Sequence, residues 1–238
     1  MSSEQLALNV NLKEGLRFES FFAENGSANA ELLAILNSFV DSTEAQQNII
    51  WGESLSGKTH LLQACCAKQA GNRGSVSYIP LKVLSIHGVE VLKGLSNSAL
   101  VVVDDVDSVI GDKIWETALF NLINQTRDKQ QRLLLSSQNN PRKLNCVLPD
   151  LASRLIWGGS YQLQILSDDE KPKALKARAE QRGFELNDRV VDYLFRHYPR
   201  DLESLMDILN QLDKESLRLR TKITVPFVKQ ILNNNSAG

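Results

Sequence analysis

Segments with the apolar content of buried strands alternate with segments of helical periodicity along the first two thirds of the chain. Five segments have the length and composition of strands: 48–51, 75–81, 99–103, 132–136 and 161–166. Three segments repeat apolar residues at helical spacing, one before the first strand and two between strands: 29–40, 60–69 and 112–129. Because 99–103 is a continuous apolar run, we expect a central parallel strand buried on both faces. The pattern predicts an α/β unit, a parallel sheet flanked by helices, that closes near residue 166.

The remainder of the chain is predicted to be helical. Ser167 is followed by acids and an early proline, which is typical of a helix start. Four helices are expected after it: 167–182, 187–198, 201–218 and 224–232. The expected domains are a flexible arm, an α/β domain, a small all-helical domain and a polar tail: 1–15, 16–166, 167–232 and 233–238.

Two details of the α/β unit are less regular. Segment 82–94 has a poor pattern and is predicted to be helix or loop. Helix 112–129 is expected to turn one apolar face inward, made of Ile114, Trp115, Ala118, Leu119, Leu122 and Ile123.

A glycine-rich loop joins the first strand to the next helix. Residues 52–59 read Gly-Glu-Ser-Leu-Ser-Gly-Lys-Thr, the G-x-x-x-x-G-K-T pattern of a phosphate-binding loop. Its glycines let several backbone N–H groups point at one phosphate, and the helix adds its positive N-terminal end. Lys58 is expected to reach the β- and γ-phosphates, and the Thr59 hydroxyl to bind Mg²⁺. The predicted nucleotide-binding residues here are Gly52, Ser54, Leu55, Ser56, Gly57, Lys58, Thr59 and His60.

Acidic and polar residues follow two of the later strands. Asp104 and Asp105 come directly after the run 99–103, as in a Walker B segment. We expect Asp104 to hold Mg²⁺ near Thr59 and Asp105 to orient or activate a water. An ordinary acidic turn is the alternative. The strand 132–136 leads into residues 137–139, a polar stretch of which one residue is expected to face the γ-phosphate.

The segment before the first helix contains two further candidates. Phe22 lies in an aromatic cluster that either packs the chain onto the core or lines a nucleotide base. Gln5, Leu6 and Leu8 belong to a short stretch that suits an extended peptide docking into an apolar groove. A disordered tail that happens to contain leucines is the alternative reading of that stretch.

Composition narrows the class of protein. The 238 residues are 42% hydrophobic and 23% charged with a net charge of −1, so no basic excess demands a nucleic-acid partner. The three cysteines form no C-x-x-C metal pattern, and their odd, sparse count suits a reducing compartment. The N-terminus has no secretory pattern and no segment approaches ~18 apolar residues. We therefore expect a cytoplasmic protein that does not enter a membrane.

Several motifs resemble the DnaA-related AAA+ ATPases. They are Trp51-Gly52, the run ending in Asp104-Asp105, Leu-Leu-Leu-Ser-Ser-Gln-Asn-Asn-Pro141 and Asp150-Leu-Ala-Ser-Arg154. Segments 148–155, 182–186 and 225–229 are similar to the shorter Hda family within that group. The resemblance covers nearly the whole chain. It implies an AAA+ core with a helical lid that binds ADP or ATP with Mg²⁺.

The resemblance also implies partners and a role. Arg154 matches the family's arginine finger, which supplies positive charge in trans to the γ-phosphate of a neighbouring molecule. Gln5, Leu6 and Leu8 fall where the family carries a peptide for the β sliding clamp of DNA polymerase III. The implied activity is promotion of ATP hydrolysis by DnaA, on DNA-loaded clamp, which restrains replication initiation. The chain itself would be a weak ATPase, and a homo-oligomer is left open.

The sequence departs from the family pattern in two places, and two other functions compete with the regulator. The chain stops after the lid, so we expect no sequence-specific origin recognition. Glu203 occupies the place of the lid arginine that contacts phosphate, so either Arg200 substitutes or the contact is lost. The alternatives to the regulator are an autonomous AAA+ ATPase and a DnaA-like loader or adaptor.

Overall fold

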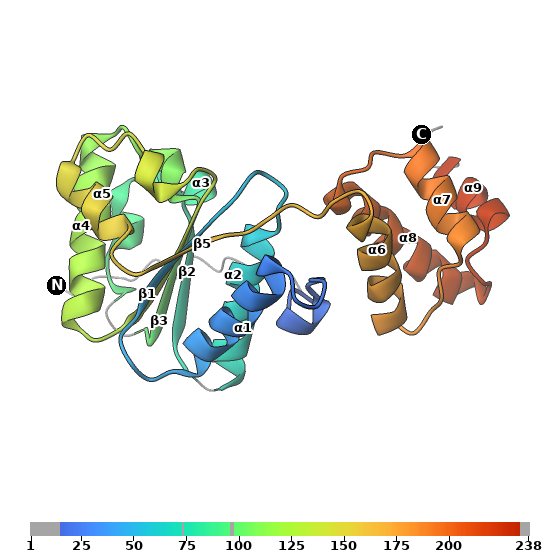
Figure 1. Ribbon diagram of the computed structural model, residues 1–238, viewed down its shortest axis with the longest axis horizontal. Helices are drawn as coiled ribbons and strands as arrows, with labels where there is room; N and C mark the ends of the chain where they lie inside the picture. Colours follow the sequence, from blue (N-terminus) through green and yellow to red (C-terminus); the bar gives the residue numbers. More distant parts are fainter. Residues whose placement is uncertain (1–14, 73, 96–97, 234–238) are drawn as a thin grey trace. The chain divides into compact units, whose positions relative to one another are not determined.

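A computed structural model describes residues 15–72, 74–95 and 98–233 (Figure 1). Its sheet has five parallel strands in the order β2-β3-β4-β1-β5. The strands are β1 (Gln47–Trp51), β2 (Val76–Pro80), β3 (Leu100–Asp104), β4 (Arg132–Ser137) and β5 (Gly159–Gln162). Every residue of β3 and β4 is buried, so the apolar runs in the sequence correspond to the middle of the sheet.

Helices cover both faces of the sheet (Figure 1). Successive strand residues point to opposite faces, so Ile50 packs with helices α1 (Ala28–Asp41) and α2 (Lys58–Gly71), whereas Ile49 packs on the other side. That other side carries α3 (Leu81–Leu84), α4 (Lys113–Asp128) and α5 (Pro149–Leu155). Short 3-10 turns complete the unit: η1 (Phe18–Ser20), η2 (Ser85–His87), η3 (Val89–Leu92), η5 (Val106–Val109) and η6 (Pro141–Lys143).

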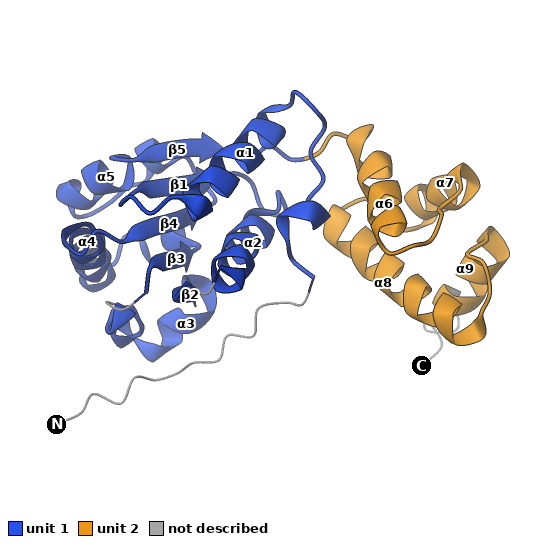
Figure 2. Ribbon diagram, turned by 90° about the horizontal axis from the view of Figure 1, so that it is seen from below, with its two compact units in different colours: residues 1–165 blue, residues 166–238 orange. Residues whose placement is uncertain are grey.

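The chain divides into two compact units, residues 1–165 and residues 166–238 (Figure 2). The second unit has its own apolar core, to which Leu175, Leu194, Leu209 and Val228 contribute. Its helices are α6 (Glu170–Gln181), α7 (Asp188–His197), α8 (Leu202–Leu219) and α9 (Val225–Asn233). The predicted fold class, a parallel α/β core followed by an all-helical part, is confirmed. No helix in the described part of the chain is long and apolar enough to cross a bilayer.

The fifth strand lies earlier than predicted. It was expected at 161–166, but β5 begins at Gly159 and ends at Gln162. Its partner β1 ends at Trp51, so pairing stops there, and the last contact is the bond from Leu163 N to Trp51 O at 2.8 Å. The glycines are part of the approach to β1: a Cβ on Gly158 would lie 1.9 Å from Gln47 O. They therefore permit strand pairing rather than interrupt it.

Helix α4 turns the predicted face inward except at its first turn: Trp115, Leu119, Leu122 and Ile123 are buried as predicted. Ile114 was expected to point inward but is 69% exposed, and Glu116 is fully buried instead. The Glu116 carboxylate accepts hydrogen bonds from the backbone N–H groups of Gly111 (2.8 Å), Val147 (3.0 Å) and Leu148 (2.6 Å). Burial alone would raise the pKa of Glu116, but these three bonds outweigh it and lower the pKa. Glu116 thus ties the segment before α5 to α4.

Candidate functional site

The glycine-rich loop has the backbone conformation that its sequence predicts. Gly57 has a φ of +98°, in the left-handed region that glycine tolerates best. A Cβ there would also lie 2.7 Å from the ring of Phe21. Leu55 adopts φ of +64° and is exposed, so the loop turns twice before α2 begins at Lys58.

The loop holds donors that the described chain leaves unused. The N–H of Gly52 donates to Ser137 O (3.2 Å) and that of Ser56 to Glu53 O (3.3 Å). Within the described residues, the N–H groups of Gly57, Lys58 and Thr59 have no acceptor, and the buried Ser56 Oγ has no partner. Unpaired N–H groups at a helix N-terminus suit an anion, so the loop fits a phosphate group.

Lys58 is folded back onto its own loop. Its Nζ donates to Gly52 O at 2.7 Å and to Glu53 O at 2.9 Å, and the residue is only 7% exposed. Burial lowers the pKa of Lys58, and the nearby carboxylates of Asp105 and Asp104 oppose that shift. The ammonium is therefore held at the loop while retaining a third donor for a ligand.

Asp104 lies in a cage of hydroxyl groups. Thr59 Oγ1 and Tyr78 Oη each donate to Asp104 Oδ2 at 2.8 Å, and Ser136 Oγ donates to Oδ1. Among the described residues no group of three or more His, Cys, Asp or Glu side chains could hold a metal ion alone. Thr59 and Asp104 fit Mg²⁺ only if phosphate oxygens and water supply the other ligands.

Tyr78 was not predicted from the sequence. It lies on β2, and the register pairs it with Val102, two residues before Asp104. Burial and the neighbouring Asp104 raise the pKa of Tyr78 well above its ordinary value, so the hydroxyl stays a donor. Only the pairing of β2 with β3 could have indicated this contact.

Asp105 occupies a special backbone position at the end of β3. Its φ is +57°, and its N–H donates to Ser136 Oγ at 2.8 Å. Burial and the charges of Asp104 and Asp107 raise the pKa of Asp105. Of the polar residues at and after the end of β4, Gln138 donates its N–H to Asp107 Oδ1 at 3.0 Å, and Ser137 Oγ donates to Asn139 O. The structure thus gathers the predicted acidic and polar strand ends beside the loop.

Phe21, the neighbour of the predicted Phe22, contacts the loop. The Phe21 ring packs edge-on against His60, with centroids 5.3 Å apart, and lies next to Gly57. His60 Nε2 lies 3.1 Å from Ser20 Oγ and 3.0 Å from Arg17 O. The His60 ring therefore fastens η1 to the start of α2. Phe22 is half-buried beside this contact.

Arg154 lies away from the loop, on the other face of the sheet. It belongs to α5, which packs with α4, whereas Lys58 begins α2 (Figure 1). The Arg154 Cζ lies 5.1 Å from the ring centroid of Trp157 and 5.8 Å from that of Phe120. No carboxylate in the described part of the chain forms an ion pair with it. A structural salt bridge within the described chain therefore does not explain where the Arg154 side chain lies.

The lid arginine candidate lies in the second unit. Arg200 donates from Nε to Phe195 O at 3.1 Å and lines a cavity of about 270 Å³ together with Asp168, Asp192 and Arg196. Glu203 is exposed in the first turn of α8, whose first turn is capped by the side chain of Asp201. The candidate clamp residues Gln5, Leu6 and Leu8 lie outside the described residues.

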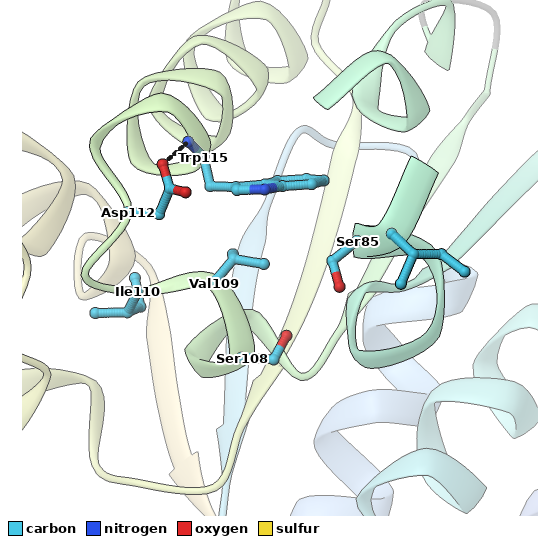
Figure 3. A pocket seen from close by; sticks show the side chains of 7 residues that line it. Ser85, Ser108, Val109, Ile110, Asp112 and Trp115 are labelled. Atoms are coloured by element: carbon cyan, nitrogen blue, oxygen red, sulfur yellow. Dashed lines mark hydrogen bonds between the residues drawn. The ribbon is translucent and has the colours of Figure 1, made fainter. Parts of the chain in front are cut away.

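A second cavity, of about 340 Å³, lies between η2, η5 and the start of α4 (Figure 3). The Trp115 ring, Ser85 and Ser108 are among the side chains that line it. Its one charged residue, Asp112, already caps α4 by accepting from the N–H groups of Ile114 (2.8 Å) and Trp115 (3.3 Å). A cavity lined by one acid and no cation does not suit phosphate, so the glycine-rich loop is the better candidate.

Comparison with known proteins agrees with this geometry. Residues 12–162 match the family model of the bacterial DnaA ATPase domain, and residues 168–232 match that of the Hda lid domain. Domain III of the Thermotoga maritima replication initiation protein DnaA is 20% identical over 92% of this chain and 96% of its own, with a TM-score of 0.73. AMPPCP-bound DnaA from Aquifex aeolicus is 22% identical over 84% and 65%, with a TM-score of 0.71. These two structures share the fold.

Proposed function

The chain belongs to the family of the bacterial DnaA ATPase domain, AAA+ proteins of replication initiation that bind nucleotide, and from this premise we propose that it regulates DnaA. The proposed regulator binds nucleotide in its own loop and presents Arg154 to the ATP of a DnaA molecule. Hydrolysis of that ATP would restrain initiation of DNA replication. The match of the helical unit to the Hda lid model supports this role over that of an initiator.

The observation that carries the proposal is the surroundings of the Arg154 guanidinium. A guanidinium of permanent charge is held on the face opposite its own loop, with aromatic rings and no carboxylate of the described chain beside it. Such a group is available to the γ-phosphate of a second molecule, where it stabilises the charge of the transition state.

The chain's own loop supports resident nucleotide. The N–H groups of Gly57, Lys58 and Thr59 and the Lys58 ammonium would hold the phosphates, and Thr59 and Asp104 would hold Mg²⁺. Bound Mg²⁺ would neutralise phosphate charge. We propose that this resident nucleotide is ADP or ATP and that its occupancy shapes the surface that meets DnaA.

The direct test measures ATP turnover in three mixtures: the protein alone, ATP-loaded DnaA alone, and both together with β clamp loaded on DNA. The regulator predicts little turnover by the protein alone and a large increase in the complete mixture. Strong turnover by the protein alone, with no increase on adding DnaA, would contradict the regulator and favour an autonomous ATPase. That second function is supported by the complete set of Lys58, Thr59, Asp104 and Asp105.

The clamp contact has its own test. We propose that Gln5, Leu6 and Leu8 form an extended peptide that docks into an apolar groove of the sliding clamp. Replacing Gln5 and Leu6 by alanine is expected to abolish capture on immobilised clamp, with the thermal unfolding curve unchanged. Undiminished capture would show that another surface makes the contact.

A further inference from the structure

The half-exposed indole of Trp157 lies next to two arginines. Trp157 comes directly after α5 and is 50% exposed. The Cζ of Arg127, in the last turn of α4, lies 3.6 Å from the ring centroid, and the Cζ of Arg154 lies 5.1 Å from it. Helices α4 and α5 run side by side, so both arginines reach the same ring (Figure 1). An indole ring attracts cations through its electron-rich face.

The ring holds Arg154 without neutralising it. A carboxylate partner would orient the guanidinium but would also cancel the charge that it has to offer a phosphate. Neither Arg127 nor Arg154 forms an ion pair with a described acid. Because the two guanidinium groups have the same charge, the stacked Arg127 favours orientations of Arg154 that point away from it.

The backbone that carries Trp157 is fixed on both sides. The Trp157 N–H donates to Arg154 O at 3.3 Å, and that carbonyl also accepts from Gln47 Nε2 at 2.7 Å. The next residue, Gly158, lies against the backbone of Gln47, where a Cβ would come within 1.9 Å of the carbonyl oxygen. The backbone around Trp157 is therefore held in place by contacts with Gln47, the first residue of β1.

We propose that Trp157, stacked on Arg127, is the positioning residue that pre-orients Arg154 for the phosphate of a second molecule. This inference rests on the proposed function and deepens it. A long side chain that is free in solution must be ordered at the moment of contact, whereas one that already lies along a ring loses less freedom. In this role Trp157 contacts neither the phosphate nor the attacking water and acts only through Arg154.

The kinetic test compares Trp157→Ala, Trp157→Phe and Arg127→Gln with the wild type in DnaA-bound ATP hydrolysis. Trp157→Ala is expected to lower the maximal rate about tenfold while changing the half-saturating protein concentration less than about twofold. Trp157→Phe, which keeps an aromatic face, is expected to recover most of the rate. Leu217→Ala, at a 74% exposed site in the second unit, is the matched control and should change neither value.

A double variant separates positioning from docking. In an Arg154→Ala background, Trp157→Ala should cause no further loss, because the indole has nothing left to orient. A raised half-saturating concentration with an unchanged maximal rate, or independent losses in the double variant, would overturn the proposal in favour of a docking residue.

A second measurement does not use activity. In the isolated protein, the ring current of Trp157 should shift the NMR signals of the Arg127 and Arg154 Nε–Hε groups. Both signals should return toward free-arginine positions in Trp157→Ala, and only partly in Trp157→Phe. An Arg154 signal unaffected by either substitution would overturn the proposal. If the wild type fails to stimulate DnaA while these shifts are present, the proposed function fails and the contact between Trp157 and Arg154 stands.

Discussion

The glycine-rich loop and the end of α5 hold their cationic side chains in opposite ways. Lys58 is buried, donates to two carbonyl groups of its own loop and has acidic neighbours. Arg154 lies against aromatic rings, with no acid of the described chain paired to it. A ligand of the loop must replace interactions that already exist, whereas a ligand of Arg154 meets a charge that has not been neutralised. The loop is thus organised for a resident ligand and the end of α5 for a visiting one.

The contrast is sharpest at Arg154. Arg154→Ala should lower the stimulated rate of DnaA-bound ATP hydrolysis about 10³-fold, since a finger supplies transition-state charge that alanine cannot. Nucleotide binding by the variant itself should be unchanged, as measured by titration with a fluorescent ADP analogue. Arg142→Ala, at an exposed arginine of η6, is the control and should retain the rate. Full regulatory activity of Arg154→Ala would instead favour a loader or adaptor.

The corresponding substitution in the glycine-rich loop is at Lys58. Lys58→Ala should weaken nucleotide binding about 100-fold, because a charge-assisted contact to phosphate is lost from a buried site. The measurement is titration calorimetry with ADP and Mg²⁺. Lys68→Ala, on the same helix but paired with Asp41 at 2.7 Å in a solvent-accessible ion pair, should bind as the wild type does. Equal binding by Lys58→Ala would mean that the loop does not hold phosphate.

Glu116 stabilises the segment that leads into α5. Glu116→Gln should reduce the free energy of unfolding by about 2–3 kcal/mol, because an amide cannot accept all three backbone N–H bonds. The folded pKa lies below the ordinary value of 4.5, so this contribution is complete above pH 4.5 and is lost as pH falls through the folded pKa. Urea unfolding at several pH values should show the wild type and variant converging in acid. A constant difference would refute the assignment, and the exposed Glu44→Gln serves as the control.

The smallest effect is expected at Tyr78. Tyr78→Phe should reduce the free energy of unfolding by about 1 kcal/mol, because Asp104 keeps the hydroxyl donors of Thr59 and Ser136. Tyr161→Phe is the matched control for Tyr78→Phe, because the Tyr161 hydroxyl forms no hydrogen bond with a described group. A loss as large as that of Glu116→Gln would mean that Tyr78 alone keeps Asp104 in place.

Local patterns in the sequence predicted the parts of the site that depend on neighbouring residues. Residues 52–59 and the acids after 99–103 were assigned from strand, turn and helix signals, and the structure brings Thr59 to within 2.8 Å of Asp104. Carboxyl ends of parallel strands meet at one edge, so order along the chain was sufficient for this proximity. The roles predicted for Asp105, Arg154 and Arg200 stay predictions.

The contacts that the sequence did not predict depend on segments far apart in the chain. Helical periodicity left Glu116 outside the apolar face of its helix, yet Glu116 is buried, because its carboxylate accepts hydrogen bonds from N–H groups of a distant segment. The bounds of β5 were wrong because its length is set by pairing with β1, a strand far earlier in the chain, and the last residue pair of that ladder joins Trp51 to Gln162. Trp157 is half-exposed, and only the packing of α4 beside α5 gives it two cations.

Gly52 has a consequence for how such chains change over evolutionary time. A Cβ at this position would lie 2.4 Å from Leu163 O, on the segment that leaves β5. Packing alone therefore requires glycine here, whatever the loop binds. A lineage that ceased to use nucleotide would still retain Gly52, while position 58 would be open to mutational drift. Replacement of Lys58, and not of Gly52, would therefore indicate that the ligand had been lost.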